Sequence, residues 1–333
     1  MIQGEIKDKE GVLLQPKKES SRIFKTVKRL IVGQLCIISL CFSPLLIAKN
    51  ITSLPEQEER SQSKIRVVMA AAFVSESGID VYDEIFNYLG EKLGKEVVFV
   101  SGFSYSTINS MLDAGMVDIG FICGLPYVLK HDKPQPSVEL LVAPVMKDKK
   151  YNDKPVYYSY VIAHKDSKID NFSDLKDKTF VFNDEISNSG YNMPRSHLIS
   201  QNETSGFFSK VIRSGSHEES IRMVALGKAD ASAVDSLVYD YDLKNNVDYV
   251  ERTKIIKRLG PVGIPPVVVS SKVPLSLRKK IRDFLVSMKN DLAGKAILEK
   301  ALVDRFIIVD DSNYDGIRKM KKQAQDAGYL KIR

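Results

Sequence analysis

Short β-prone runs alternate with helical patterns from Lys64 onward, and this alternation constrains the fold more than any other feature. Residues 65–70 are typical of a buried strand, and residues 80–93 carry apolar side chains at helical spacing. Gly94 favours a helix end there, and residues 97–100 are again β-prone. Such alternation predicts parallel βαβ units and an α/β class.

The same pattern continues to residue 302. Further strands are expected at 117–123, 156–164, 179–182, 211–214 and 230–234, and further helices at 104–112, 274–288 and 291–302. A weak internal repeat is also visible, because Gly115 and Asp118 recur as Gly227 and Asp230 after a helix and before a strand. These Gly–Asp pairs are interpreted as turn chemistry.

The N-terminal part differs from the rest. Residues 1–29 are polar, and the last part of this stretch is basic. Residues 30–48 form an apolar run of nineteen residues without a charged side chain. That length can span a hydrocarbon core, and the basic flank predicts a cytoplasmic tail at 1–29. A cleaved signal peptide is the alternative, but the long leading region favours an uncleaved transmembrane anchor. Residues 49–63 are polar and aperiodic, as in a linker.

Composition excludes several classes of protein. The formal net charge is +7, but no dense Lys/Arg run follows residue 63, so nucleic-acid binding is not expected. Cys36 and Cys41 lie in the apolar segment, and Cys123 is alone in the main body. An internal disulfide there is excluded, and no Cys/His spacing suggests a metal. We expect neither a metal nor a cofactor.

Residues 179–198 carry the clearest functional signal. The expected strand at 179–182 is followed by Ser187-Asn188-Ser189-Gly190 and then by a helix. Small polar residues at a helix start leave free backbone N–H groups at the positive end of the helix dipole, which suits an oxyanion. The alternative is that Ser187 or Ser189 is an ordinary helix N-cap.

Several ordered pieces of the chain resemble the phosphate/phosphite/phosphonate-binding proteins of ABC importers. The pieces are Ile65-Arg66-Val67-Val68, Asp118-Ile119-Gly120-Phe121, Leu125-Pro126-Tyr127-Val128, Phe172-Ser173-Asp174-Leu175-Lys176, Ser187-Asn188-Ser189-Gly190-Tyr191, Ser214-Gly215-Ser216-His217-Glu218, Ala233-Val234-Asp235 and Tyr314-Asp315. Together they cover roughly 64–320. No single piece is specific, but their order and spacing are.

The resemblance implies a two-lobed type 2 periplasmic binding protein fold with the ligand in an interlobe cleft. We expect one lobe at 64–157 plus 259–333 and the other at 158–258. Ligand binding would close the lobes about a hinge.

The family's ligand residues fall on eight positions of this sequence. The resemblance implies that Ser187, Asn188, Ser189 and Gly190 grip the oxyanion, with Asn188 where Thr is the commonest residue. It also implies that Tyr105 and Tyr127 cover the phosphorus group, that His217 is a cleft histidine, and that Asp235 receives an amino group in some members. The alternatives are a packing tyrosine, a solvated surface histidine and a turn aspartate.

The expected function is capture of phosphonate, phosphite or phosphate for an ABC permease and its ATPase, on the periplasmic or extracellular face of the membrane. A membrane-tethered sensor of the same fold is the alternative. Because the chain lacks Gly-x-Ser-x-Gly, a Walker motif and a metal-ligand cluster, we expect no enzyme. A hydrolase using Ser187 or Ser189 with His217 is the remaining catalytic alternative.

Overall fold

The computed structural model describes residues 64–70, 78–100 and 104–333, all within the compact unit Thr52–Arg333. The predicted tail, apolar segment and linker at 1–63 lie outside the described residues. Within the described ranges, none of the helices combines the length and the apolar character needed to cross a membrane.

Six strands form the first sheet, in the order β11-β4-β10-β3-β1-β2. They are β1 (Lys64–Met69), β2 (Glu96–Val100), β3 (Ile119–Phe121), β4 (Val138–Met146), β10 (Val267–Ser270) and β11 (Val303–Ile307). β1 pairs in parallel with β2 and β3, whereas β10 and β11 run antiparallel to the strands beside them.

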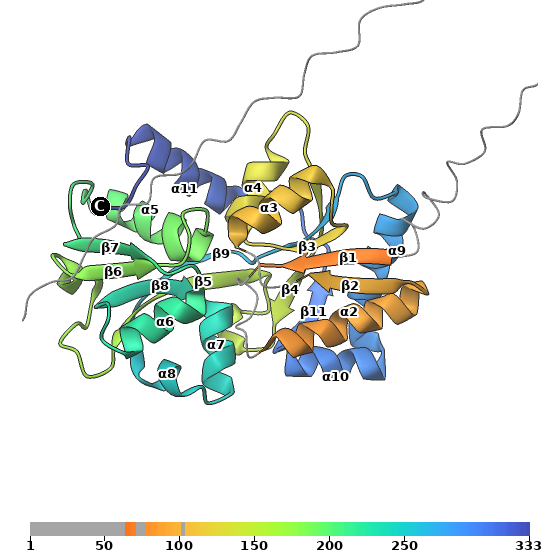
Figure 1. Cartoon of the computed structure of the whole chain (residues 1–333), viewed down its shortest axis with the longest axis horizontal. Helices are drawn as coiled ribbons and strands as arrows, with labels where there is room; N and C mark the ends of the chain where they lie inside the picture. Colours follow the sequence, from red (N-terminus) through yellow and green to blue (C-terminus); the bar gives the residue numbers. More distant parts are fainter. Residues whose placement is uncertain (1–63, 71–77, 101–103) are drawn as a thin grey trace, which may run out of the picture. The chain divides into compact units, whose positions relative to one another are not determined.

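Helices cover both faces of this first sheet (Figure 1). Val67 packs with α2 (Ile79–Leu93), α9 (Leu275–Ser287) and α10 (Leu292–Lys300). The next residue, Val68, faces α3 (Tyr105–Ala114) and α4 (Gly124–His131). Because both faces are buried, the strands read as continuous apolar runs. This sheet and its helices are called the first lobe.

Five strands form the second sheet, in the order β7-β6-β8-β5-β9. They are β5 (Val156–His164), β6 (Thr179–Phe182), β7 (Lys210–Arg213), β8 (Ala231–Asp235) and β9 (Thr253–Gly263). One face packs against α5 (Met193–Ser200), and the other against α6 (His217–Ala225), α7 (Ser236–Lys244) and α8 (Asp248–Glu251). This sheet and its helices are called the second lobe.

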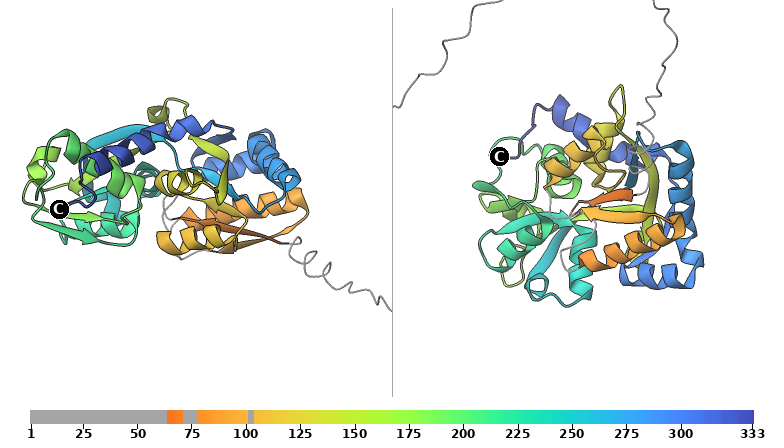
Figure 2. Two further views of the ribbon diagram at one scale, coloured as in Figure 1. Left: turned by 90° about the horizontal axis from the view of Figure 1, so that it is seen from above. Right: turned by 45° about the vertical axis from the view of Figure 1, so that its right-hand side comes forward.

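Two short crossovers join the sheets, at 147–155 and 264–266. After β11, the chain forms η6 (Asp311–Tyr314) and α11 (Asp315–Asp326), and α11 lies beside both α4 and α5 (Figures 1 and 2). Ile317 joins the apolar cluster of the first lobe, whereas Tyr329 and Ile332 join that of the second. The C-terminal segment therefore contacts both lobes. The lobe boundaries at 157/158 and 258/259 stay a prediction.

The Gly–Asp repeat has the same structure in both lobes. Gly115 and Gly227 have φ values of +65° and +67°, the left-handed conformation that favours glycine after a helix. The carboxylate of Asp118 accepts the backbone N–H of Arg66 at 2.7 Å, and that of Asp230 accepts the N–H of Thr179 at 2.7 Å. The predicted turn chemistry is confirmed, and each aspartate ties its strand to the neighbouring one.

Candidate functional site

The 187–190 turn leads from β6 into a π-helical turn, η4 (Asn188–Asn192), that continues as α5. Ser187 is the N-cap, because its Oγ accepts the N–H of Gly190 at 3.1 Å. The N-cap interpretation of Ser187 is therefore confirmed. It does not compete with an anion site, since a helix start has several N–H groups without intrahelical acceptors.

Ser189 lies at the centre of a buried polar cluster. Its hydroxyl donates to Oδ2 of Asp235 at 3.1 Å and lies 3.4 Å from Nε2 of His217. All three side chains have 0% relative exposure. The alternative of a solvated surface histidine at 217 is therefore wrong. Since His217 begins α6 and Asp235 caps α7, three helix starts converge on this point.

The protonation state of His217 follows from its surroundings. The N–H of Asp235 donates to Nδ1 at 3.3 Å, so the neutral ring carries its proton on Nε2. Burial lowers the pKa of His217 to about 3, which keeps the ring neutral at physiological pH. Its Nε2–H points toward the hydroxyl oxygen of Ser189, which can accept it. His217 is therefore a neutral hydrogen-bond donor.

Asp235 is a buried carboxyl group with no cationic partner in the part of the chain that the structure describes. Its Oδ1 accepts the N–H of Leu237 at 2.9 Å, and it forms no ion pair with a Lys or Arg of the described ranges. Burial raises the pKa of Asp235 well above its usual range, and hydrogen bonds from Leu237 and Ser189 oppose this only in part. An ionised Asp235 would gain from a cationic ligand group.

Asn188 connects the turn to the first lobe. Its backbone N–H donates to Sγ of Cys123 at 3.3 Å, at the start of α4. Its side-chain Nδ2 donates to the hydroxyl of Tyr157 at 2.9 Å. Tyr157 and Cys123 were not predicted as site residues. Nothing in the β-prone run 156–164 distinguishes Tyr157 from Tyr158 or Tyr160, because only the sheet decides which face each ring takes.

Tyr105 joins this cluster from the first lobe. Its side chain is 2% exposed, and its hydroxyl has no hydrogen-bond partner among the described residues. Burial raises the pKa of Tyr105 well above 10, and Cys123, Asp235 and Ser187 are near enough to influence its ionisation. A buried phenol with an unused proton is a donor that a bound oxyanion would satisfy.

Tyr127 is placed differently. It lies inside α4, and its hydroxyl donates to Asp311 at 2.6 Å. Its ring packs on Tyr314, with 4.7 Å between centroids. The hydroxyl is thus not hydrogen-bonded to the Ser189–His217–Asp235 cluster. Of the predicted residues, Tyr105, Ser187, Asn188, Ser189, Gly190, His217 and Asp235 come together.

Gly190 is enclosed by the cluster. A Cβ at this position would lie 1.9 Å from Oδ1 of Asn183 and 3.2 Å from Cε1 of His217. Only glycine fits there without displacement of the Asn183 side chain.

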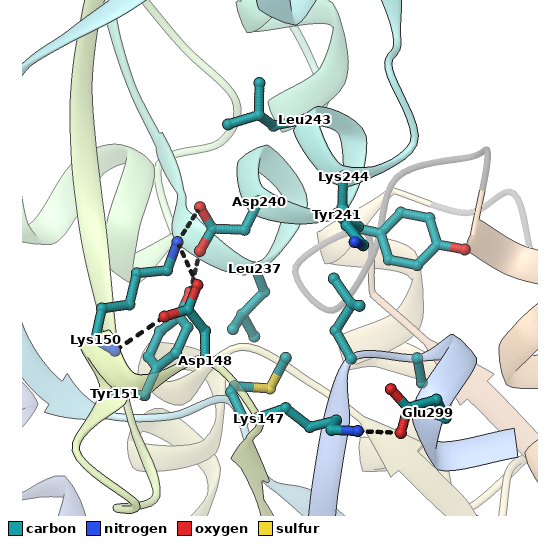
Figure 3. A pocket seen from close by; sticks show the side chains of 13 residues that line it. Lys147, Asp148, Lys150, Tyr151, Leu237, Asp240, Tyr241, Leu243, Lys244 and Glu299 are labelled. Atoms are coloured by element: carbon teal, nitrogen blue, oxygen red, sulfur yellow. Dashed lines mark hydrogen bonds and ion pairs between the residues drawn. The ribbon is translucent and has the colours of Figure 1, made fainter. Parts of the chain in front are cut away.

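A separate cavity of about 430 Å³ borders the crossover at 147–155, and none of the eight predicted residues lines it. Figure 3 shows its charged side chains, several of which pair with one another. Lys150 contacts Asp148 and Asp240, and Lys147 contacts Glu299. The hydroxyl of Tyr151 donates to Asp240. This cavity is therefore distinct from the cluster around Ser189.

Comparison with known proteins shows the family to which the chain is similar. The family model described as "ABC transporter, phosphonate, periplasmic substrate-binding protein" matches residues 67–314. The phosphonates-binding periplasmic protein of Escherichia coli K12 is 23% identical over 269 residues, 79% of this chain and 77% of that protein.

A second relative comes from Prochlorococcus marinus MIT 9301. The "Probable ABC transporter phosphite binding protein PhnD1" is 27% identical over 185 residues, 54% of this chain and 62% of that protein. The solved structure of PhnD1 in complex with methylphosphonate has a TM-score of 0.70 at 19% identity, over 79% of this chain and 98% of that chain.

A Pseudomonas aeruginosa binding protein component of an ABC phosphonate transporter has a TM-score of 0.71 at 21% identity, over 80% of this chain and 88% of that chain. These structures share the two-lobed α/β fold predicted from the sequence. With its family match over residues 67–314 and this fold, the chain belongs to the periplasmic substrate-binding proteins of phosphonate ABC transporters.

Proposed function

We propose that this protein binds a phosphonate, or a closely related phosphite or phosphate, in the cluster around Ser189 and presents it to an ABC permease. The observation that carries the proposal is the convergence of buried neutral donors from both lobes. Ser189 and the Nε2–H of His217 come from the second lobe. The hydroxyl of Tyr105, which has no hydrogen-bond partner among the described residues, comes from the first. A ligand that contacts both sets holds the lobes together.

The hydrogen bonds of such a site are strong enough to bind a charged ligand. Hydrogen bonds to a charged group contribute about 1.5–3 kcal/mol each, and several of them outweigh the association cost to give roughly micromolar binding. Because the cluster is buried, the lobes must separate for ligand to enter. Ligand release to a permease would use the same movement.

The state of His217 argues against the hydrolase alternative. A histidine that activates a serine must present an unprotonated nitrogen to the hydroxyl. Here Nδ1 accepts a backbone N–H, so Nε2, which faces Ser189, carries the proton. The pair therefore favours binding over nucleophilic chemistry.

Asp235 divides the candidate ligands into two groups. An aminoalkyl phosphonate would bring an ammonium group that neutralises the buried carboxylate, whereas methylphosphonate would leave Asp235 protonated. Asp235→Asn should therefore weaken binding of 2-aminoethylphosphonate and leave methylphosphonate binding within a few-fold.

The family match supports a proposal about the partners. We propose a permease and its ATPase as the acceptors of the ligand, with tethering through residues 30–48 raising the local concentration near them. Tethering would serve a sensor equally, and neighbouring genes for a permease and an ATPase would favour transport.

The test is calorimetric titration of the full chain with phosphate, phosphite, methylphosphonate and 2-aminoethylphosphonate. We expect at least one to bind, and Ser189→Ala to weaken that binding by about tenfold or more. The melting temperature should fall by only about 2–4 °C. Ser196→Ala removes a comparable hydroxyl, which donates to Gln323 at 2.7 Å, and should leave affinity unchanged. No heat with any of the four ligands would refute the proposed function.

A further inference from the structure

Arg195 is a buried cation with no counterion among the described residues. Its side chain is 9% exposed, and its guanidinium lies 5.4 Å from the ring centroid of Tyr191. One terminal nitrogen donates to the carbonyl of Leu330 at 2.8 Å, and the other donates to Oδ1 of Asn192 at 2.9 Å. It forms no ion pair with any Asp or Glu of the described ranges. A buried charge that lacks a carboxylate partner needs another source of compensation.

A chain of hydrogen bonds leads from Arg195 to the candidate site. Asn192 Nδ2 donates to Oδ1 of Asn188 at 3.0 Å, and Asn188 Nδ2 donates to the hydroxyl oxygen of Tyr157 at 2.9 Å. Asn188, Asn192 and Tyr157 are all completely buried. This connected set, Arg195–Asn192–Asn188–Tyr157, is called the relay.

Arg195 determines which group donates and which accepts in every hydrogen bond of the relay. Arginine has donors and no acceptor, so Asn192 must turn its oxygen toward Arg195. The amide nitrogen of Asn192 then faces Asn188, which must present its own oxygen and point its nitrogen at Tyr157. The positive end of the relay therefore faces the tyrosine.

Tyr157 ends the relay as a donor. Its oxygen already accepts from Asn188, so its own proton is directed elsewhere in the enclosed cluster. Burial keeps the phenol protonated, because it raises the pKa of Tyr157 well above 10. Hydrogen bonds in series polarise one another in a buried environment, which makes the last O–H a stronger donor.

We propose that Arg195 and Asn192 are positioning residues for oxyanion binding, acting through Asn188 to orient and polarise the hydroxyl of Tyr157 toward the ligand. The proposal rests on the proposed function, since it requires a bound oxyanion. In this proposal, the bound anion compensates the positive charge of the buried Arg195 guanidinium. The two charges are not in contact, and three hydrogen bonds connect Arg195 to the Tyr157 hydroxyl.

The test is a double-mutant cycle between Arg195→Met and Tyr157→Phe in the full chain, titrated calorimetrically with methylphosphonate or with whichever of the four ligands binds. Each single variant should bind about tenfold more weakly than wild type. The double variant should bind within about twofold of Tyr157→Phe alone, because the relay has lost its end. Arg195→Lys should recover part of the affinity.

Two further variants make the result decisive. Arg252→Met removes an arginine that pairs with Asp248 on the surface, and it should bind like wild type. If Arg195→Met does not fold, Asn192→Leu interrupts the relay while keeping the arginine, and it should show the same dependence on Tyr157. The relay would be overturned if Arg195→Met weakened binding equally in wild type and in Tyr157→Phe, or did not weaken it at all. Ligand binding by wild type would still support the proposed function in either case.

Discussion

Gly190 occupies a crowded backbone position at the end of the 187–190 turn. A methyl group there would meet the Asn183 side chain at 1.9 Å, and Asn183 in turn contacts His217. We expect Gly190→Ala to lower the free energy of unfolding by about 1–3 kcal/mol and to weaken ligand binding, since Asn183 must move. Urea unfolding and calorimetry would measure the two effects.

Gly316→Ala is the matched control for this substitution. Its added Cβ would have its nearest neighbour, Val262, at 3.7 Å, which is an ordinary contact. It lies in α11, where alanine is the better helix former, so stability should stay constant or rise slightly. A Gly190→Ala variant as stable and as tight-binding as wild type would mean that the turn adapts freely.

His217 makes the protein sensitive to acid. Its pKa is about 3 in the folded protein and near 6.5 in an unfolded chain, so unfolding takes up a proton between these values. The stability it contributes is complete above about pH 6.5 and is lost as the pH falls toward about 3. Asp235 makes the opposite contribution to the pH dependence of stability. Its raised pKa favours the folded state at low pH and disfavours it as the pH rises.

Comparison of His217→Gln with wild type isolates the histidine. Between about pH 6 and pH 4.5, wild type should lose about 2 kcal/mol more of its unfolding free energy than the variant does. Urea unfolding at several pH values measures this difference. Parallel stability curves for the two proteins would show that His217 does not titrate in this way.

At the scale of elements, the two Gly–Asp turns are equivalent supports for the two sheets. Each aspartate accepts a backbone N–H from the start of a neighbouring strand, β1 for Asp118 and β6 for Asp230. We expect Asp118→Ala and Asp230→Ala each to cost about 1–2 kcal/mol of stability, by leaving that N–H without its partner. Asp83→Ala, on the exposed side of α2, should stay within about 0.5 kcal/mol of wild type. A large difference between the two aspartates in urea unfolding would argue against structural equivalence.

Local pattern was enough to predict many of these elements. The expected strands at 156–164 and 179–182 coincide with β5 and β6, because their β-branched and aromatic residues are buried on both faces. β4 was not predicted, and Pro144 within it is a residue that argues against a strand. β9 also contains a proline, Pro261, which the sheet tolerates because β9 is an edge strand.

The contacts that assemble the site lie beyond sequence patterns. Asn188 meets Cys123 and Tyr157, which precede it by 65 and 31 positions. Arg195 meets the carbonyl of Leu330, 135 positions later. Local periodicity carries no information about such pairs, so the sequence suggested the 187–190 turn but not the residues that orient it.

At the scale of the whole molecule, the C-terminal segment joins the two lobes a third time. Arg318 fixes it to the first lobe through Asp132, at 2.8 Å, and pairs with Asp311 inside the segment itself. Tyr329 and Ile332 are buried in the second lobe, and the N–H of Ile332 donates to the hydroxyl of Tyr191 at 3.0 Å. Tyr191 directly follows Gly190, so this segment braces the helix that begins at the candidate site.

This attachment has a consequence for the order of folding. Residues 329–332 are translated after every other member of the apolar cluster that they join in the second lobe. The sheet of the first lobe likewise needs β10 and β11, which are made after the whole second sheet. Neither lobe can therefore be completed while the ribosome is still making residues 64–300, so each lobe depends on segments made late in synthesis.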